Sequence, residues 1–332
     1  MSKSKLSFRV DASKSIGLGH ISRCIELARL LKNNFDISFY SKEMPENLIS
    51  TINEAGLNFN LIKNEDIFFN KIKNQNVVLD GYQFNSDYQK NLSYFANKLV
   101  CIDERTNIFY HSDVLINNNP DFPENSFNIK DGGKVYSGIE FSILKEAFRK
   151  ENKKKYKPLT KSSLFSKIFI CFGGSDSKNL SKKTAEIIAR HTNASAYIVL
   201  GPLHDQVNNK DIRLDNVKVY SSLTSDAIVK LVKKSDLAIV PCSTIMLEVF
   251  CIGKPVISGW FEENQKNSLE YFNKNNFLTN CGNFNDKRFE DNLVSALKKF
   301  DLKIANKQIA NQKAIQFSDS KITELFKNLY EK

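Results

Sequence analysis

Short apolar segments rich in Val, Ile, Leu and Phe alternate along the chain with longer stretches in which apolar residues recur every three or four positions. Short runs of this kind predict buried strands, whereas a period near 3.6 residues predicts amphipathic helices. The clearest helix is expected at His20–Lys32. Its apolar positions, which fall on one face, are Ile21, Cys24, Ile25, Ala28 and Leu31.

The same alternation occurs in both halves of the chain. In the first half we expect strands at Ser7–Val10, Ile37–Tyr40, Val77–Leu79, Leu99–Ile102 and Val114–Ile116. In the second half we expect strands at Lys167–Phe172, Ala196–Leu200, Val217–Tyr220, Leu237–Val240 and Pro255–Ser258. Helices in this half are expected at Leu180–Arg190, Ser225–Lys233, Ile245–Cys251 and Asn264–Phe272. Alternating strands and helices at this spacing predict an α/β fold, with parallel sheets covered by helices.

A chain of 332 residues is longer than one ordinary core supports, so we expect two domains. The boundary is placed in the basic, proline-containing stretch near Lys150–Ser163, which gives one α/β domain at residues 1–155 and a second at 156–332. After Phe289 the chain is expected to be helical to its end. In open α/β sheets ligands bind outside the carboxyl ends of the strands, so residues that follow the strands are the candidates for chemistry.

Composition places the chain among folded proteins. Hydrophobic residues make up 41% of it and aromatic residues 11%, which excludes a largely disordered chain. No apolar run approaches the roughly 20 residues that cross a bilayer, and the first residues lack the apolar core of a signal peptide. The six cysteines form no CxxC pair, and most lie inside apolar runs. We therefore expect a soluble, cytoplasmic, monomeric protein without membrane insertion, whose cysteines are buried reduced thiols.

The net charge of +11 raises the question of a nucleic-acid partner. The densest basic run, Arg149–Lys161, has seven basic residues and one acid. A run of this kind that contains a proline is typical of a solvated linker or helix end. Zinc-finger and ribonucleoprotein patterns are absent from the sequence, and the four histidines lack metal-ligand spacing. We expect no nucleic-acid partner, and a preference for small anionic ligands instead.

The turn after the first expected strand carries the first candidate site. Asp11 ends the strand, Gly17 and Gly19 follow, and His20 opens the helix. Glycines let the backbone approach a ligand closely, and the start of a helix favours negative charge. The GxGxxG pattern of dinucleotide-binding folds is absent, because Ser22 stands at the third glycine position. Taken alone, His20 is as consistent with a helix cap as with a catalytic residue.

A second turn of this type consists of Gly173, Gly174 and Ser175, between an expected strand and a helix. Paired glycines before a helix suit phosphate binding through backbone N–H groups, although a tight structural turn has the same pattern.

In the third turn, Ser243 or Thr244 can cap the following helix, and Glu248 lies one turn further along the same face. Phosphate at the helix end and a carboxylate one turn inward would match an extended nucleoside diphosphate, with ribose hydroxyls donating to the carboxylate. The alternative is that Glu248 is an ordinary surface acid.

Taken in order, these segments resemble one enzyme family. The segments that carry the resemblance are Phe8–Asp11, Ile16–Arg23, Asp80–Tyr82, Asp103–Glu104, Phe172–Leu180, Ser243–Glu248 and Glu263–Gln265. They look like the nucleotide-sugar hydrolases of pseudaminic acid biosynthesis, which act on UDP-2,4-diacetamido-2,4,6-trideoxy-β-L-altropyranose. The resemblance runs from about Phe8 to about Phe272. It implies a type-B glycosyltransferase (GT-B) fold, in which two Rossmann-like domains face each other across a cleft.

The resemblance also implies roles for single residues. His20 matches the catalytic histidine, and we expect it to act as general base, with Asp11 or Tyr82 as orienting partner. Tyr82 and Asn264 match residues that line the sugar site. Further residues expected to bind the substrate are Asp11, Gly17, Gly19 and Gln265. The residues expected at the nucleotide side are Gly173, Gly174, Ser175, Ser243, Thr244 and Glu248. The family usually has a bulkier residue where this chain has Gly81, so a wider or looser sugar pocket is expected.

The family's reaction is hydrolysis between the anomeric carbon of the sugar and the β-phosphate oxygen, which releases UDP and a free sugar. The sequence has no carboxylate cluster suited to a metal ion, so we expect turnover without a metal or other cofactor. Two alternatives remain open at this point. One is a GT-B glycosyltransferase that passes the sugar of a UDP-sugar donor to an acceptor, and the other is a non-catalytic binder of nucleotides or nucleic acid.

Overall fold

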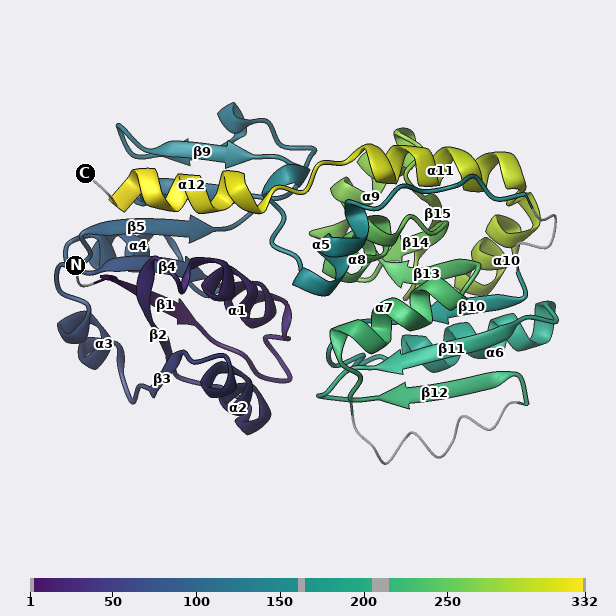
Figure 1. Cartoon of the computed structure of the whole chain (residues 1–332), viewed down its shortest axis with the longest axis horizontal. Helices are drawn as coiled ribbons and strands as arrows, with labels where there is room; N and C mark the ends of the chain where they lie inside the picture. The colour runs from purple at the N-terminus through teal and green to yellow at the C-terminus, as the bar shows by residue number, and fades with distance from the viewer. Residues whose placement is uncertain (1–2, 161–164, 205–214, 331–332) are drawn as a thin grey trace. The chain divides into compact units, whose positions relative to one another are not determined.

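Runs of Val, Ile and Leu at the expected strand positions form two separate parallel sheets, each covered by helices (Figure 1). Branched side chains pack well on pleated surfaces, and sheets covered on both faces need apolar residues throughout. The computed structural model describes residues 3–160, 165–204 and 215–330. The chain divides into two compact units. The first unit holds the chain up to Ile143 and from Phe317 onwards, and the second holds Leu144–Gln316.

The sheet of the first unit has seven parallel strands. In spatial order they are β3 (Asn58–Leu61), β2 (Phe35–Ser41), β1 (Ser4–Val10), β4 (Asn76–Asp80), β5 (Lys98–Ile102), β7 (Val114–Asn117) and β9 (Lys134–Ser137). Strand order therefore reverses between β1 and β4, which is where open α/β sheets bind ligands. Val10 pairs with Asp80 in this register, so the carboxyl ends of both strands lie at the same level.

The helices of this unit include one from the far end of the chain. They are α1 (Gly19–Leu31), α2 (Glu46–Glu54), α3 (Glu65–Lys71), α4 (Ser86–Ser93) and α12 (Asp319–Tyr330). The smaller elements are β6 (Phe109–Tyr110), β8 (Asn128–Ile129), η1 (Glu124–Ser126) and η2 (Ile139–Phe141). Phe326 of α12 is fully buried, and the ring of Tyr330 lies 5.4 Å from that of Phe35 in β2. The division thus differs from the expected one, which ended the first domain at residue 155 and assigned the last helix to the second.

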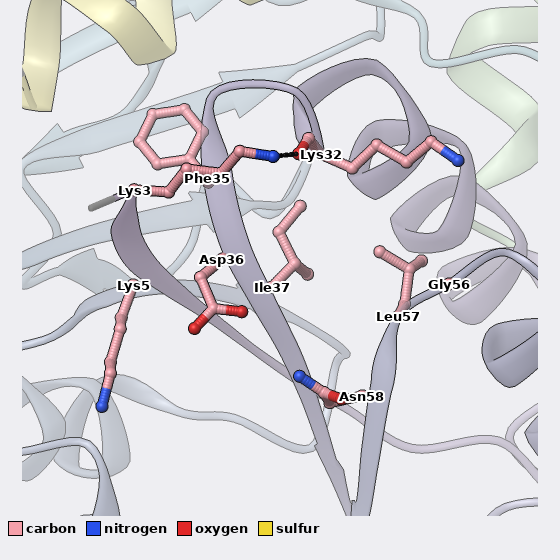
Figure 2. A pocket seen from close by; sticks show the side chains of 9 residues that line it. All are labelled: Lys3, Lys5, Lys32, Phe35, Asp36, Ile37, Gly56, Leu57 and Asn58. Carbon is pink, nitrogen blue, oxygen red and sulfur yellow. Dashed lines mark hydrogen bonds between the residues drawn. The ribbon is translucent and has the colours of Figure 1, made fainter. Parts of the chain in front are cut away.

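A pocket lies at the amino ends of β1, β2 and β3 (Figure 2). Lys3, Lys5 and Lys32 line it together with Asp36. The ammonium of Lys3 donates to the Lys32 carbonyl at 2.7 Å, where α1 ends. This is the edge of the sheet opposite to the ends of β1 and β4, so the pocket is separate from the reversal point described above.

The sheet of the second unit has six parallel strands. In spatial order they are β12 (Val217–Ser221), β11 (Ser195–Leu200), β10 (Lys167–Ile170), β13 (Leu237–Pro241), β14 (Val256–Trp260) and β15 (Thr279–Asn283). The helices are α5 (Glu146–Asn152), α6 (Leu180–His191), α7 (Ser225–Lys234), α8 (Thr244–Ile252), α9 (Gln265–Lys274), α10 (Phe289–Lys299) and α11 (Leu302–Ala314). Here the order reverses between β10 and β13, so each unit has a Rossmann-like arrangement.

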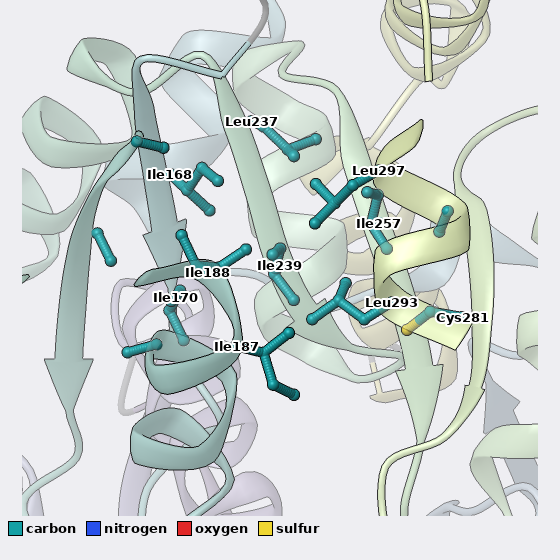
Figure 3. Close-up of a cluster of buried hydrophobic side chains, with 14 of the residues drawn as sticks. Ile168, Ile170, Ile187, Ile188, Leu237, Ile239, Ile257, Cys281, Leu293 and Leu297 are labelled. Atoms are coloured by element: carbon teal, nitrogen blue, oxygen red, sulfur yellow. The ribbon is translucent and has the colours of Figure 1, made fainter. Parts of the chain in front are cut away.

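Figure 3 shows one face of the core that holds this sheet together. Ile170 of β10 and Ile239 of β13 meet Ile187 of α6 and Leu293 of α10, and all four are fully buried. Because these side chains come from elements on both sides of the reversal, they fix the positions of the loops that follow β10 and β13. Both loops carry candidate residues.

The basic run is only partly the solvated segment that the sequence predicts. The helix α5 covers its first residues, and α5 packs against α8. Lys150 is exposed, as expected, but Arg149 is buried, so the expectation is wrong for that residue. The two residues differ in exposure because they lie on different faces of α5, and α8 covers one of these faces. Lys161, at the end of the run, lies outside the described residues.

Candidate functional site

The first candidate site forms where β1 and β4 end side by side. The loop after β1 leads to Gly19 and His20, the first two residues of α1. Gly17 has a φ of 83°, and its N–H donates to the Ser13 carbonyl at 2.8 Å. Glycine adopts this left-handed conformation readily, so the loop can close tightly. As a result, His20 reaches Asp80, the last residue of β4.

His20 is hydrogen-bonded to Asp80. His20 Nδ1 lies 2.7 Å from Asp80 Oδ1. Arg23, one turn further along α1, donates to both oxygens of the same carboxylate. An ionised carboxylate can only accept, so we assign the ring proton to Nδ1, which leaves the lone pair on Nε2 able to take a proton. The sequence pointed to Asp11 or Tyr82 as the orienting partner, whereas the carboxylate that accepts the hydrogen bond from His20 belongs to Asp80.

The Asp80 carboxylate is an anion locked into this network. Its side chain is fully buried, and Cys24 Sγ donates to Oδ2 at 3.4 Å. Burial by itself raises the pKa of Asp80, but the charges of Arg23 and His20, with the hydrogen bonds from both, hold that pKa well below its usual range. Asp80 therefore stays ionised at neutral pH and keeps the His20 ring in one orientation.

Tyr82 lies against His20. The two rings meet edge to face, with centroids 4.8 Å apart. The Tyr82 hydroxyl donates to Glu104 Oε1 at 2.5 Å, and Arg105 Nη1 donates to the Tyr82 carbonyl at 2.7 Å. Arg105 is itself held by an ion pair with Asp103. The expected sugar-site tyrosine is thus next to the expected base, but Arg105, which clamps it, carried no signal in the sequence.

Asp11 has a supporting position beside this network. Its buried carboxylate accepts from Arg9 Nη1 at 2.6 Å, from the Lys42 N–H at 2.7 Å and from Gln83 Nε2 at 3.1 Å. Gly81 makes the last contact possible, because a Cβ added there would lie 2.5 Å from Gln83 Oε1. The absence of a side chain at position 81 is therefore matched by Gln83, which takes up the space that the sequence predicted to be open.

The second candidate site lies at the reversal between β10 and β13. Gly173 and Gly174 follow β10, and Gly173 has a φ of 85°. Gly201, after β11, approaches so closely that an added Cβ would lie 2.3 Å from the Gly174 carbonyl oxygen. The glycine turn is therefore packed against a third glycine, which the sequence analysis missed. Ser175 in this turn is half-buried.

The two helix starts at this edge differ in what they offer an anion. At α6, the buried carboxylate of Asp176 accepts from the N–H groups of Leu180 at 2.8 Å and Ser181 at 3.0 Å. At α8, the side chain of Ser243 occupies the N-cap position but makes no capping hydrogen bond. Ser243 and Thr244 are both half-buried. An anion would therefore find N–H groups at the start of α8, whereas Asp176 already satisfies the start of α6.

Glu248 lies one turn into α8 and is buried. Its Oε1 lies 3.4 Å from the ammonium of Lys145, the residue that precedes α5. The Glu248 side chain is only 2% exposed, but that of Lys145 is 33% exposed. Glu248 is therefore no ordinary surface acid, and the group of this pair that faces solvent is the lysine.

The remaining expected residues lie after β14. Asn264 is exposed at the N-cap of α9. Gln265 Oε1 accepts from the Phe261 N–H at 3.0 Å, so this side chain fastens the preceding loop. The structure thus places Asn264 where a ligand could reach it, and it gives Gln265 a structural contact.

Three further properties bear on chemistry. All six cysteines are buried free thiols, which confirms that expectation. Among the described residues, no group of three or more His, Cys, Asp or Glu side chains is placed to hold a metal ion. Across the same ranges, no helix combines the length and apolar character needed to cross a membrane.

Comparisons of sequence identify two relatives, and no family model matches the chain. An uncharacterized protein of Methanocaldococcus jannaschii is 29% identical over 345 aligned positions, which cover 96% of this chain and 69% of that one. The UDP-2,4-diacetamido-2,4,6-trideoxy-β-L-altropyranose hydrolase of Campylobacter jejuni is 24% identical, over 82% of this chain and 97% of the enzyme.

Comparisons of structure confirm the fold. MurG of Acinetobacter baumannii superposes with a TM-score of 0.59 at 12% identity and covers 98% of this chain and 99% of its own. A UDP-glucosyltransferase from Polygonum tinctorium superposes with a TM-score of 0.66 at 11% identity, over 100% of both chains. These proteins are GT-B glycosyltransferases, so the chain has the GT-B type of fold, built from two Rossmann-like domains.

Proposed function

We propose that the protein is a nucleotide-sugar hydrolase that converts UDP-2,4-diacetamido-2,4,6-trideoxy-β-L-altropyranose to UDP and the free sugar. The observation that carries the proposal is the His20–Asp80–Arg23 network at the reversal point of the first sheet. Support for the substrate comes from the hydrolase of Campylobacter jejuni, which shares 24% of its aligned residues with this chain.

In this proposal His20 is the general base. With the proton on Nδ1 held by Asp80, His20 Nε2 takes a proton from water as the water oxygen attacks the anomeric carbon. The bond from that carbon to the β-phosphate oxygen breaks, and UDP leaves with the electron pair. Tyr82 packs against His20 and would contact the sugar, and Asn264 is the second residue that we assign to the sugar.

We assign the UDP leaving group to the carboxyl edge of the second sheet. Backbone N–H groups at Gly173, Gly174 and Ser175, with those at the start of α8, would stabilise the developing negative charge. Each well-aimed donor of this kind is worth about 3–4 kcal/mol in the transition state. Glu248, while it stays paired with Lys145, would accept from the ribose hydroxyls.

The decisive experiment is to incubate the protein with the UDP-linked diacetamido-trideoxyhexose in ¹⁸O-labelled water, with EDTA present. We expect UDP and free sugar, with the label on the anomeric hydroxyl of the sugar. Label on the phosphate of UDP would refute attack at the anomeric carbon. Loss of turnover that magnesium restores would refute the expectation that no metal is required.

Glycosyl transfer is the second candidate, because both solved structures described above are glycosyltransferases. The same nucleotide site would then serve a donor sugar, but an acceptor hydroxyl would replace water. The labelled-water experiment separates the two, since a transferase releases little labelled sugar and, once an acceptor is added, forms an unlabelled glycoside instead.

A further inference from the structure

We propose that Lys145 binds the diphosphate of the nucleotide, an inference that rests on the proposed function and extends it by one residue. Lys145 stands at the N-cap of α5, and α5 packs against α8. The long side chain extends from α5 to Glu248, one turn into α8. It therefore reaches the helix whose start is the expected phosphate site.

The burial of the two partners determines which of them can meet a ligand. Glu248 is a buried carboxylate, and a charge in such a place needs a partner. Lys145 supplies it at 3.4 Å, while a third of its own side chain stays exposed. The carboxylate thus anchors the lysine, and Lys145 is the partner of this pair whose side chain solvent can reach.

The glycine turn lies close to the same pair. Cys171 directly follows β10 and lies two residues before Gly173. The pKa of the Cys171 thiol is raised to about 11, mainly by burial; the N–H of Gly173 and the charge of Lys145 lower it, and the charges of Glu248 and Asp176 raise it. The turn follows β10 and α8 follows the neighbouring strand β13, so Glu248 and its partner Lys145 lie at the sheet edge that carries the turn expected to bind phosphate.

The charges at this edge explain why a cation is needed there. Glu248 and Asp176 are both buried carboxylic acids near the expected phosphate site, and their negative charge would repel UDP. A lysine before the first turn of a helix is unfavourable for the helix itself, because a helix start favours anions. Its position is understandable if the ammonium compensates Glu248 and then binds phosphate, which lysine does as a strong point charge.

The test measures UDP and uridine binding by calorimetry in the whole protein, with Lys145→Gln, Lys145→Arg and a matched control. The control is Lys150→Gln, an exposed lysine on the same helix. We expect Lys145→Gln to weaken UDP binding about tenfold, the scale of one charge-assisted hydrogen bond, and to leave uridine binding unchanged. Lys145→Arg should restore most of the UDP affinity, and the control should bind as the wild type does.

Two results would overturn the inference. One is wild-type UDP affinity in Lys145→Gln, and the other is an equal loss of UDP and uridine, which would mean that the lysine acts only through Glu248. If Lys145→Gln does not fold, the comparison is made between Glu248→Gln and the double variant Lys145→Gln/Glu248→Gln, in which no buried charge is left alone. A wild-type protein that binds no UDP would refute the proposed function itself, which is a separate outcome.

Discussion

Replacing Asp80 by Asn tests the proposed base more sharply than replacing the histidine, because it leaves the imidazole in place. Oδ1 of Asp80 accepts from His20 and Arg23, and Oδ2 accepts from Arg23 and Cys24. The asparagine amide has one oxygen and one NH₂ group in place of these two oxygens. Its NH₂ group must therefore face hydrogen-bond donors on one of the two sides, either His20 and Arg23 or Arg23 and Cys24. If NH₂ faces His20, Nδ1 has to accept, the ring proton moves to Nε2, and the base is lost.

The size of the effect follows from this geometry. Loss of a general base lowers turnover by about 10²–10⁴-fold, which is about 3–5 kcal/mol in the activation free energy. The same substitution leaves the Arg23 guanidinium without its buried counter-charge, which lowers the free energy of unfolding by about 3–5 kcal/mol. We therefore expect Asp80→Asn to lose turnover and thermal stability together, while UDP affinity, which we assign to the second unit, is unchanged.

The assay is kcat and KM on the UDP-sugar, with thermal melting and UDP calorimetry on the same samples. Asp113→Asn is the matched control, because Asp113 also pairs with cations, Lys98 and Lys130, but precedes β7 at the opposite edge of the sheet. It should lose stability and keep turnover. If Asp80→Asn is unfolded, Asp80→Asn/Arg23→Gln removes the stranded charge. A folded variant with near-normal turnover would refute the role given to Asp80.

Three further outcomes are expected. His20→Gln should lower turnover by about 10²–10⁴-fold with unchanged UDP affinity, since the amide can hold water but cannot take its proton; loss of UDP binding instead would make His20 a structural residue. Gly81→Ala should raise KM for the UDP-sugar more than Gln83→Ala does, because the added Cβ meets Gln83 and the φ of 152° disfavours any side chain; equal KM values in Gly81→Ala and wild type would contradict this. Burial raises the pKa of Glu65, but the hydrogen bond from Arg9, with those of Tyr88 and Lys42, lowers it from 4.5 to about 2. Its stabilising effect is therefore present above pH 4.5 and lost as pH falls toward 2, so urea unfolding of Glu65→Gln and wild type should differ at neutral pH and converge in acid; a gap that does not depend on pH would contradict the assignment.

The sequence predicted the strands of both sheet centres because they are short apolar runs with little polar content. It missed the edge strands β3, β9 and β15, since most of their residues are at least partly exposed. A strand that is only partly covered does not need an apolar run, so its sequence resembles a loop. The last helix was assigned to the wrong unit for a different reason. Its apolar stripe predicts that it packs somewhere, but only the folded chain shows that α1 is the partner.

The candidate site, like the fold, was predictable from the sequence only where a local pattern marks its residues. The residues that follow strands, including His20 and the glycine turn, are visible because glycines before helices form local patterns. Asp80 and Lys145 act through residues far away in the chain, at His20 and at Glu248. No local pattern carries such a pairing, because it depends on which strands and helices become neighbours. The family resemblance included Asp80 as part of a motif but said nothing about its partner.

Strand register decides whether the first site exists at all. Val10 pairs with Asp80, and successive side chains of a strand point to opposite faces of the sheet. A shift of β4 by one residue would turn the Asp80 carboxylate to the other face, away from α1. His20 would then lose its partner, and Arg23 would lose its counter-charge. The apolar residues Val77, Val78 and Leu79, all buried, oppose such a shift because they would exchange faces too. The orientation of the proposed base therefore depends on the packing of β4. Substitutions that loosen this strand should impair turnover even where they are remote from the substrate.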